Sequence, residues 1–332
     1  MLIATIATAL GIGLSGAASA AADPAASYFP LPSCCPMQEV QAGGGLVVLG
    51  DENGEHGYVL RLDPATGAVT GQLDLFVSPV GNNDYANFFS APKLAVADGS
   101  VWFSSYFDNR VYRLNAVTLA VEDIVKTGRS PASLIRADGS LWVTLNNDQA
   151  IQRIDPVHDR VTATIKVGNQ SQTDQPSRIA WTGTQLLVSL PATGRVAHVS
   201  PRGRVLGYDR VGDAAGYSLL RIDPVPGGYW LDDTDGGTTY WRWSYARHRL
   251  TRHFDTQGGW GSVVARGVLY TGGAVCDSNG NCTQGLVEKH DPTTGRLLAT
   301  RRFGPVGAWF PQTAFGGLWT TDFNQLQRSA LF

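Results

Sequence analysis

A short phrase of apolar and aromatic residues returns seven times along the chain, each time after a turn sequence. Typical copies read GSVWFSS from Gly99, GSLWVTL from Gly139 and GGLWTTD from Gly316. A turn followed by a short continuous apolar run is typical of a strand that is buried on both faces. The third residues of the copies lie 39 to 55 positions apart: Leu46, Val101, Leu141, Leu186, Tyr229, Val268 and Leu318.

Three further strands are predicted around each copy of this phrase. An apolar segment precedes the turn, as in Ser133–Ala137, and an alternating segment follows the phrase, as in Ile151–Ile154. A second turn and an outer strand then complete the repeat. One such sheet cannot bury its faces alone, so a repeat of about 40–45 residues predicts the blades of a β-propeller.

The fold predicted is therefore all-β: a seven-bladed β-propeller of four-stranded antiparallel blades. The last copy leaves room for only one strand, Gln325–Leu331, before the chain ends at Phe332. Residues near Ser27–Leu31 or Gln38–Gln41 are the two sources of the missing strand, and sharing of the last blade by both terminal segments would leave no open edge. We expect a signal peptide at 1–20, an N-terminal segment at 21–35 that completes the last blade, and a single propeller domain at 36–332.

The second turn of the repeat is itself repeated and indicates a structural role for its acidic residues. It reads DPATG from Asp63, DPVHD from Asp155 and DPTTG from Asp291. Aspartate accepts hydrogen bonds from backbone amides ahead of it, and proline presets the φ angle of the next position. These three carboxylates are therefore not predicted to be catalytic.

Composition and charge exclude several classes of function. The chain is 43% hydrophobic with a net charge of −2, so it lacks the basic surface of a nucleic-acid-binding protein. Leu2–Leu14 is apolar and precedes a small-residue cleavage sequence at Ala18–Ala20, which predicts export to the cell envelope or medium. No later segment is long and apolar enough to span a bilayer. We expect a monomer with a small molecule, or a secreted or cell-surface protein, as its partner.

Four cysteines are consistent with an oxidising compartment. Cys276 and Cys282 flank a turn-rich insert, and a disulfide that closes this short loop is predicted. Cys34 and Cys35 are adjacent, and they are compatible either with a bond to each other or with crossed bonds to the other pair.

The blade phrase resembles the superfamily of YVTN-repeat, quinoprotein amine dehydrogenase β-chain-like and streptogramin B lyase propellers. The residues that carry the likeness are Asp98–Phe103 followed by Asn109–Leu114. Similarity to streptogramin B lyases would imply a histidine base and acidic residues that hold a divalent metal. Of the six histidines only His56 falls in a loop expected near the axis, so it is the one catalytic candidate. A quinoprotein-like dehydrogenase has the least support.

One face of the propeller is predicted to collect acidic and aromatic residues, because the loops between second and third strands and the loops that enter each blade converge there. Hard oxygen ligands suit Ca²⁺ or Mg²⁺, and aromatic rings beside a few polar groups suit a small cyclic or sugar-like ligand. The principal hypothesis is a secreted binding protein, and the alternative is a metal-assisted lyase or hydrolase acting on a cyclic or lactone-like substrate. The metal candidates are Asp51, Asp108, Asp148, Asp232 and Asp322. The ligand-binding candidates are Phe88, Phe89, Arg129, Arg178, Tyr217, Trp260, Trp309 and Phe310.

Overall fold

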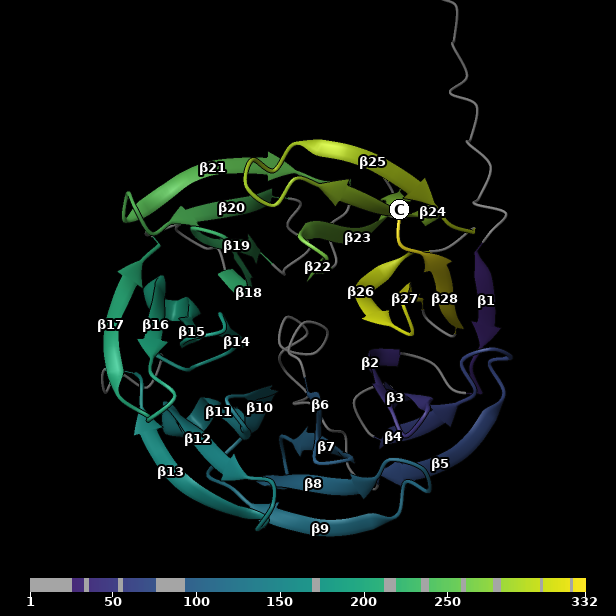
Figure 1. Ribbon diagram of the computed structural model, residues 1–332, viewed down its shortest axis with the longest axis horizontal. Coiled ribbons are helices and arrows are strands. Elements are labelled where there is room, and N and C mark those ends of the chain that lie inside the picture. The colour runs from purple at the N-terminus through teal and green to yellow at the C-terminus, as the bar shows by residue number, and fades with distance from the viewer. Residues whose placement is uncertain are drawn as a thin grey trace, which may run out of the picture.

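Seven four-stranded antiparallel sheets stand in a ring in the computed structural model of the chain (Figure 1). The structure describes residues 26–32, 36–52, 56–75, 93–168, 174–211, 219–233, 239–257, 261–276, 282–304, 307–322 and 325–332. In six of the seven sheets the strands follow one another in sequence order from the axis outward. The predicted seven-bladed β-propeller is confirmed.

The blades are numbered in chain order, and each is given from its innermost to its outermost strand. Blades 1 to 3 contain β2 (Pro36–Ala42), β3 (Gly45–Glu52), β4 (His56–Leu62) and β5 (Val69–Leu75); β6 (Leu94–Ala97), β7 (Ser100–Ser105), β8 (Arg110–Asn115) and β9 (Val121–Lys126); and β10 (Pro131–Ala137), β11 (Ser140–Leu145), β12 (Ala150–Asp155) and β13 (Arg160–Lys166). Blades 4 and 5 contain β14 (Ile179–Trp181), β15 (Leu186–Leu190), β16 (Arg195–Val199) and β17 (Val205–Arg210); and β18 (Leu219–Val225), β19 (Gly228–Asp233), β20 (Thr239–Ser244) and β21 (Arg249–Asp255). Blades 6 and 7 contain β22 (Ser262–Ala265), β23 (Val268–Cys276), β24 (Cys282–His290) and β25 (Leu297–Arg302); and β26 (Trp309–Ala314), β27 (Gly317–Thr321), β28 (Gln325–Ala330) and β1 (Ser27–Pro30).

Both ends of the chain contribute to blade 7. The outermost strand β1 pairs with β28, with Ser27 opposite Arg328 and Pro30 opposite Gln325. The N-terminal strand thus completes the sheet that the last three strands of the chain form, and the ring is closed (Figure 1). Of the two predicted sources for this strand, Ser27–Leu31 is therefore the correct one. Gln38–Gln41 instead belongs to β2, the innermost strand of blade 1.

Burial explains the apolar phrase of the sequence. All residues of β7, β11 and β15 are buried, because each second strand is covered on both faces by neighbouring blades. The outer strand β13 alternates between exposed and half-buried residues, as a strand with one solvated face does. The core therefore lies between the blades rather than in a single centre.

The turns and the repeated carboxylates have the predicted structural roles. Asp98 and Gly99 have φ values of 49° and 80°, so the turn between β6 and β7 has positive φ at both central residues. Asp63 Oδ1 accepts hydrogen bonds from the amides of Ala65 and Thr66 at 2.9 and 2.8 Å. These bonds lower the pKa of Asp63, which is consistent with a turn-capping residue.

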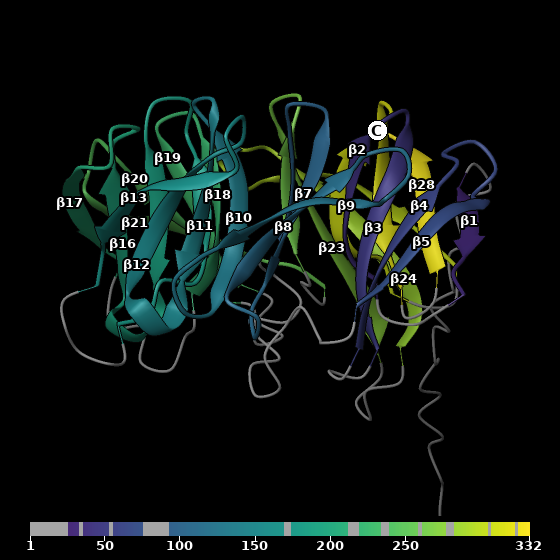
Figure 2. The same ribbon diagram turned by 90° about the horizontal axis from the view of Figure 1, so that it is seen from below.

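The ring has two unlike faces. The tight-turn face carries the turns that join first to second and third to fourth strands, such as 98–99 and 116–120. The loop face carries the segments between second and third strands and between blades, such as 106–109 and 127–130. Figure 2 shows the ring from the side, with the two faces at opposite ends of the strands. The short 3₁₀ helices at Asn146–Asp148 and Pro191–Thr193 lie on the loop face.

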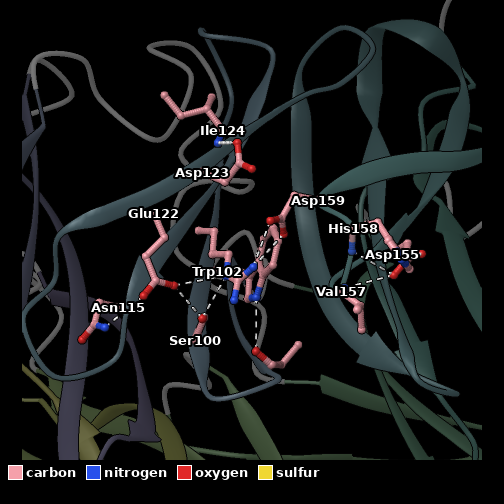
Figure 3. Close-up of polar contacts among 12 residues, drawn as sticks. Ser100, Trp102, Asn115, Glu122, Asp123, Ile124, Asp155, Val157, His158 and Asp159 are labelled. Atoms are coloured by element: carbon pink, nitrogen blue, oxygen red, sulfur yellow. Dashed lines mark hydrogen bonds and ion pairs between the residues drawn. The ribbon is translucent and has the colours of Figure 1, made fainter.

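Basic residues of the third strands connect successive blades near the tight-turn face. Arg113 forms ion pairs with Glu122 of its own blade and with Asp159 of the next blade, at 3.1 and 2.9 Å. Its guanidinium lies 5.7 Å from the ring centre of Trp102, and Figure 3 shows Glu122 and Asp159 on either side of this tryptophan. Each blade has a basic third-strand residue at the register of Arg113, opposite the second-strand residue equivalent to Trp102: Arg61, Arg113, Arg153, His198, Arg242, Lys289 and Arg328.

Three predictions concern the cysteines, the signal peptide and membrane-spanning helices. Cys276 and Cys282 form the predicted disulfide, which links the ends of β23 and β24. The predicted signal peptide and the adjacent Cys34 and Cys35 lie outside the described residues. Among the described residues, no helix has the length and apolar character needed to cross a membrane.

Candidate functional site

The loop face brings together residues that are separated by about 45 positions in the sequence. Arg129 lies in the segment that enters blade 3, and Asp148 lies in the 3₁₀ helix between β11 and β12 of the same blade. Gln175 precedes β14 and comes from the segment that enters blade 4. The predicted convergence of the two kinds of loop on one face therefore holds for these residues.

A cavity of about 350 Å³ opens between blades 3 and 4 on this face. Among the described residues, every one that lines it is polar or charged, and two of these six are cationic. Lys166, at the end of β13, donates a hydrogen bond from Nζ to the backbone carbonyl of Asp148 at 2.6 Å. The lining residues are Arg129, Asn147, Asp148, Gln149, Lys166 and Gln175.

Hydrogen bonds hold the cavity residues in place. Arg129 Nε lies 2.8 Å from Asp148 Oδ1, and Arg129 Nη2 donates to the carbonyl of Asn147 at 2.7 Å. Gln175 Nε2 donates to Asn147 Oδ1 at 3.3 Å. Burial alone would raise the pKa of Asp148, but the backbone amide and guanidinium of Arg129 together hold that pKa below its usual value. Asp148 is therefore an anion that neutralises one of the two cations, and the lining carries a net positive charge.

A second polar cluster lies on β18, β19 and β20 of blade 5 and at the start of β22 in blade 6. Asp232 of β19 is opposite Arg221 of β18, and its Oδ1 accepts the backbone amide of Arg221 at 3.2 Å. Ser262, which begins β22, donates a hydrogen bond from its hydroxyl to Asp223 Oδ2. Tyr240 of β20 donates to the carbonyl of Gly261 at 3.2 Å. Two carboxylates, a phenol and a hydroxyl are thus packed near the axis of the ring.

Burial dominates the electrostatics of this cluster. It raises the pKa of Asp232 to about 6, while the charge of Arg221 lowers that pKa and the charge of Asp223 raises it further. Burial also raises the pKa of Asp223, against the charge of Arg221. Arg178 lowers the pKa of Asp232 as well, which places this predicted ligand-binding residue beside the predicted metal-binding carboxylate. Carboxyls with raised pKa values in such settings act as proton donors in many enzymes.

Other predicted site residues lie apart from both clusters. Asp108 accepts hydrogen bonds from Ser105 and Tyr112 at 3.0 and 2.7 Å, between blades 1 and 2. Asp322 is buried at the end of β27 and accepts a bond from Gln325 Nε2 at 3.0 Å. Phe310 is buried on β26 with a φ of 48°, and His56 is exposed at the start of β4.

The metal prediction receives no geometric support from the part of the chain that the structure describes. No three histidine, cysteine, aspartate or glutamate side chains gather there in a way that could hold a metal ion. Hence Ca²⁺ or Mg²⁺ stays a prediction. The candidates Phe88, Phe89, Tyr217 and Trp260 lie outside the described residues, as do the side chains of Asp51 and Trp309.

Sequence reasoning missed Lys166, Arg221 and Asp223. Lys166 ends an outer strand and Arg221 and Asp223 lie within an inner one, and both kinds of strand were interpreted as packing elements. A signal was present in the sequence, because the inner strands at Leu94–Ala97 and Ile179–Trp181 carry no charge whereas β18 carries two. Only the register between β18 and β19 shows that these charges meet Asp232.

The chain is similar in fold to solved structures with which it shares little sequence. No family model and no curated protein sequence matches the chain. Among solved structures, virginiamycin B lyase from Staphylococcus aureus superimposes with a TM-score of 0.65 at 11% identity, over 92% of this chain and 99% of the lyase. A catalytically inactive variant of that lyase with quinupristin gives a TM-score of 0.66 at 12% identity, over 92% and 99% of the two chains. The protein U3-55K gives 0.68 at 10% identity, over 93% and 99%.

The chain therefore shares its overall fold with virginiamycin B lyase and with U3-55K. At these levels of identity the likeness concerns the fold alone, since propellers support many unrelated functions. The histidines give no evidence of a shared activity either. His56 is exposed at a strand end, and the other histidines fall in third strands, outer strands or turns.

Proposed function

We propose that the protein is an exported binding protein whose loop face takes a small acidic, hydroxyl-rich ligand. The observation that carries this proposal is the cavity between blades 3 and 4, whose described lining residues are all polar or charged. Its volume of about 350 Å³ lies within the range of small-molecule sites. The net positive charge of its lining favours an anionic ligand, and the amides of Asn147 and Gln175 suit hydroxyl groups.

Two cations of the cavity retain donors for such a ligand. Arg129 makes two hydrogen bonds through Nε and Nη2, and within the described residues its Nη1 makes none. Lys166 makes one bond through Nζ, which carries three protons. An acidic group bound here would gain charge-assisted hydrogen bonds from both side chains.

Calorimetric titration with a galacturonic acid trisaccharide and with the matched neutral galactose trisaccharide tests the proposal. We expect the acidic trisaccharide to bind at least about tenfold more tightly, because only it has a charge to pair with the cations. The double variant Arg129→Ala/Lys166→Ala should lose this preference, whereas Lys126→Ala, an exposed cation outside the cavity, should keep it. Equal affinity for both sugars, no binding of either, or an unchanged double variant contradicts the proposal.

The second candidate function is a metal-assisted lyase or hydrolase that acts on a cyclic or lactone-like substrate. It is favoured by the buried carboxyls of Asp223 and Asp232, which lie beside Arg221 and Ser262, and by the fold likeness to virginiamycin B lyase. In this case, turnover of a lactone panel should depend on a divalent cation and should disappear in Asp232→Asn. The binding proposal expects no turnover with or without the cation.

A further inference from the structure

A separate cavity of about 460 Å³ opens on the tight-turn face, between blades 4 and 5. Its walls come from the turn between β14 and β15, the turn between β18 and β19, and the start of the turn after β20. None of the described residues that line it is charged, in contrast to the cavity on the loop face. The lining residues are Trp181, Thr182, Thr184, Gln185, Pro224, Val225, Pro226, Gly227, Gly228 and Tyr245.

The aromatic residues of this cavity break the repeat that shapes the rest of the tight-turn face. Trp181 pairs with Leu186, and the residue at the same register is Arg136 in blade 3 and Pro224 in blade 5. The remaining blades have Gln41, Val96, Val264 and Thr313 there, so Trp181 is the one aromatic residue at this register. It is half-buried, and it packs in part against the core between blades 3 and 4.

Tyr245 departs from the repeat in the adjoining blade. It follows Ser244 at the end of the third strand, where Pro64, Pro156 and Pro292 follow an aspartate in other blades. Two departures in neighbouring blades thus line one cavity. Their proximity is a property of the folded ring, because 64 positions separate Trp181 and Tyr245 in the sequence.

Polar groups in the cavity remain available to a ligand. Among the described residues, the side-chain amide of Gln185 and the indole N–H of Trp181 make no hydrogen bond, although both line the cavity. Tyr245 also lines the cavity, but its phenol oxygen is buried and without a hydrogen-bond partner in the described part of the chain, so it is not one of the available groups. The hydroxyl of Thr182, by contrast, is used within its own turn, where it accepts the amide of Gln185 at 3.1 Å.

We propose that this cavity binds a neutral sugar ring of a glycan. Aromatic side chains provide flat apolar surfaces for the C–H face of a pyranose, while Gln185 and the Trp181 indole provide donors for its hydroxyls. The absence of charge in the lining disfavours an acidic sugar, since a buried carboxylate needs a cation or several donors. The site is distinct from the loop face, so the molecule would hold a glycan on one face and its acidic ligand on the other.

Saturation-transfer NMR and tryptophan fluorescence titration of the full chain with maltopentaose, cellopentaose and mannopentaose test this proposal. We expect at least one of these neutral oligosaccharides to bind. Gln185→Ala should weaken that binding by about fivefold or more through loss of one hydrogen-bonding side chain. Trp181→Ala should abolish it and Trp181→Phe should retain part of it. Gln72→Ala, an exposed glutamine on β5 far from the cavity, is the matched control and should bind as the parent does.

The outcomes distinguish a sugar from a proline-rich peptide, which are the two classes of ligand that a cavity of aromatic and proline residues can bind. Absence of binding by all three oligosaccharides overturns the proposal, as does binding that survives both Gln185→Ala and Trp181→Ala. Binding of a decaproline peptide with loss in Trp181→Ala, but no sugar binding, assigns the cavity to a peptide and also overturns it. Because Arg129→Ala/Lys166→Ala leaves this cavity intact, failure on the loop face and failure here are measured independently.

Discussion

The two faces of the ring use the same residue types for different purposes. On the tight-turn face, Arg61, Arg113 and Arg328 each reach the next blade, to Ala116, Asp159 and Pro64 respectively. These contacts recur because their residues recur once per blade. On the loop face, Arg129 and Lys166 line a cavity, and Lys166 has basic counterparts at the same register in Lys126, Arg210 and Arg302. A cation that reaches the next blade is therefore structural, and a cation whose donors face a cavity is a candidate for ligand binding.

The first prediction concerns a repeated residue with the largest expected effect. Trp102 is fully buried between blades 2 and 3, so Trp102→Ala should lower the free energy of unfolding by about 3–5 kcal/mol through lost packing. Phe107, an exposed aromatic of the loop face, is the control. Phe107→Ala should change the free energy of unfolding by less than about 0.5 kcal/mol. Urea denaturation followed by circular dichroism measures both. A similar loss for the two variants would break the comparison.

The second prediction concerns Glu39, which departs from the repeat in the core itself. It occupies the inner-strand register held by Leu134, Ile179 and Ile222 in other blades, and neither of its carboxylate oxygens has a hydrogen bond within the described residues. Burial raises the pKa of Glu39 from 4.5 to about 8.

The sign of the pH dependence follows from this shift. The folded protein binds the Glu39 proton more tightly than the unfolded chain does, so the contribution of Glu39 to stability is fully present below pH 4.5 and is lost as the pH rises toward about 8. The loss is about 1.4 kcal/mol per pH unit at most. In Glu39→Gln this slope should disappear, and the variant should be more stable than the parent at pH 8 by a few kcal/mol, to order of magnitude. Urea denaturation at pH 5 and pH 8 tests this, and parallel pH profiles for the two proteins would refute it.

The third prediction separates contacts between blades from contacts within one blade. Arg113→Ala removes ion pairs to Glu122 and Asp159 and the stacking on Trp102, and should cost about 1–2 kcal/mol of unfolding free energy. Arg153 occupies the same register in blade 3 but bonds Ser140 of its own blade at 2.9 Å. Arg153→Ala should therefore cost less than Arg113→Ala, and thermal unfolding in low and high salt compares them. An equal cost would mean that the bridge to the next blade adds nothing.

The smallest effect on stability is expected at the ligand cavity. The side chain of Arg129 is 69% exposed, and exposed ion pairs contribute little to folding. Arg129→Ala should change the free energy of unfolding by less than about 0.5 kcal/mol while it weakens binding of the acidic trisaccharide. Denaturation and calorimetry on the same preparation give both values. A large loss of stability would place Arg129 with the structural cations of the other face.

Prediction from sequence succeeded where the structural information is local. The phrase at Ser100–Ser105 and the turn at Asp98 and Gly99 each depend on neighbouring residues, and both were interpreted correctly. The disulfide between Cys276 and Cys282 closes a short loop and was predicted for the same reason. Arg129 and Asp148 were assigned to the same face, but their ion pair and the contribution of Lys166 depend on contacts that no repeat encodes.

The sequence by itself determined the number of blades, the order of strands within each blade and the closure by both terminal segments, because strand and turn propensities act over a few residues and recur at a regular interval. Only the tertiary structure decided that Arg221 faces Asp232, that Arg113 reaches Asp159, and that Trp181 and Tyr245 line one cavity. Such pairs depend on strand register and on the packing of one blade against the next. These pairs come into contact only when the ring has closed.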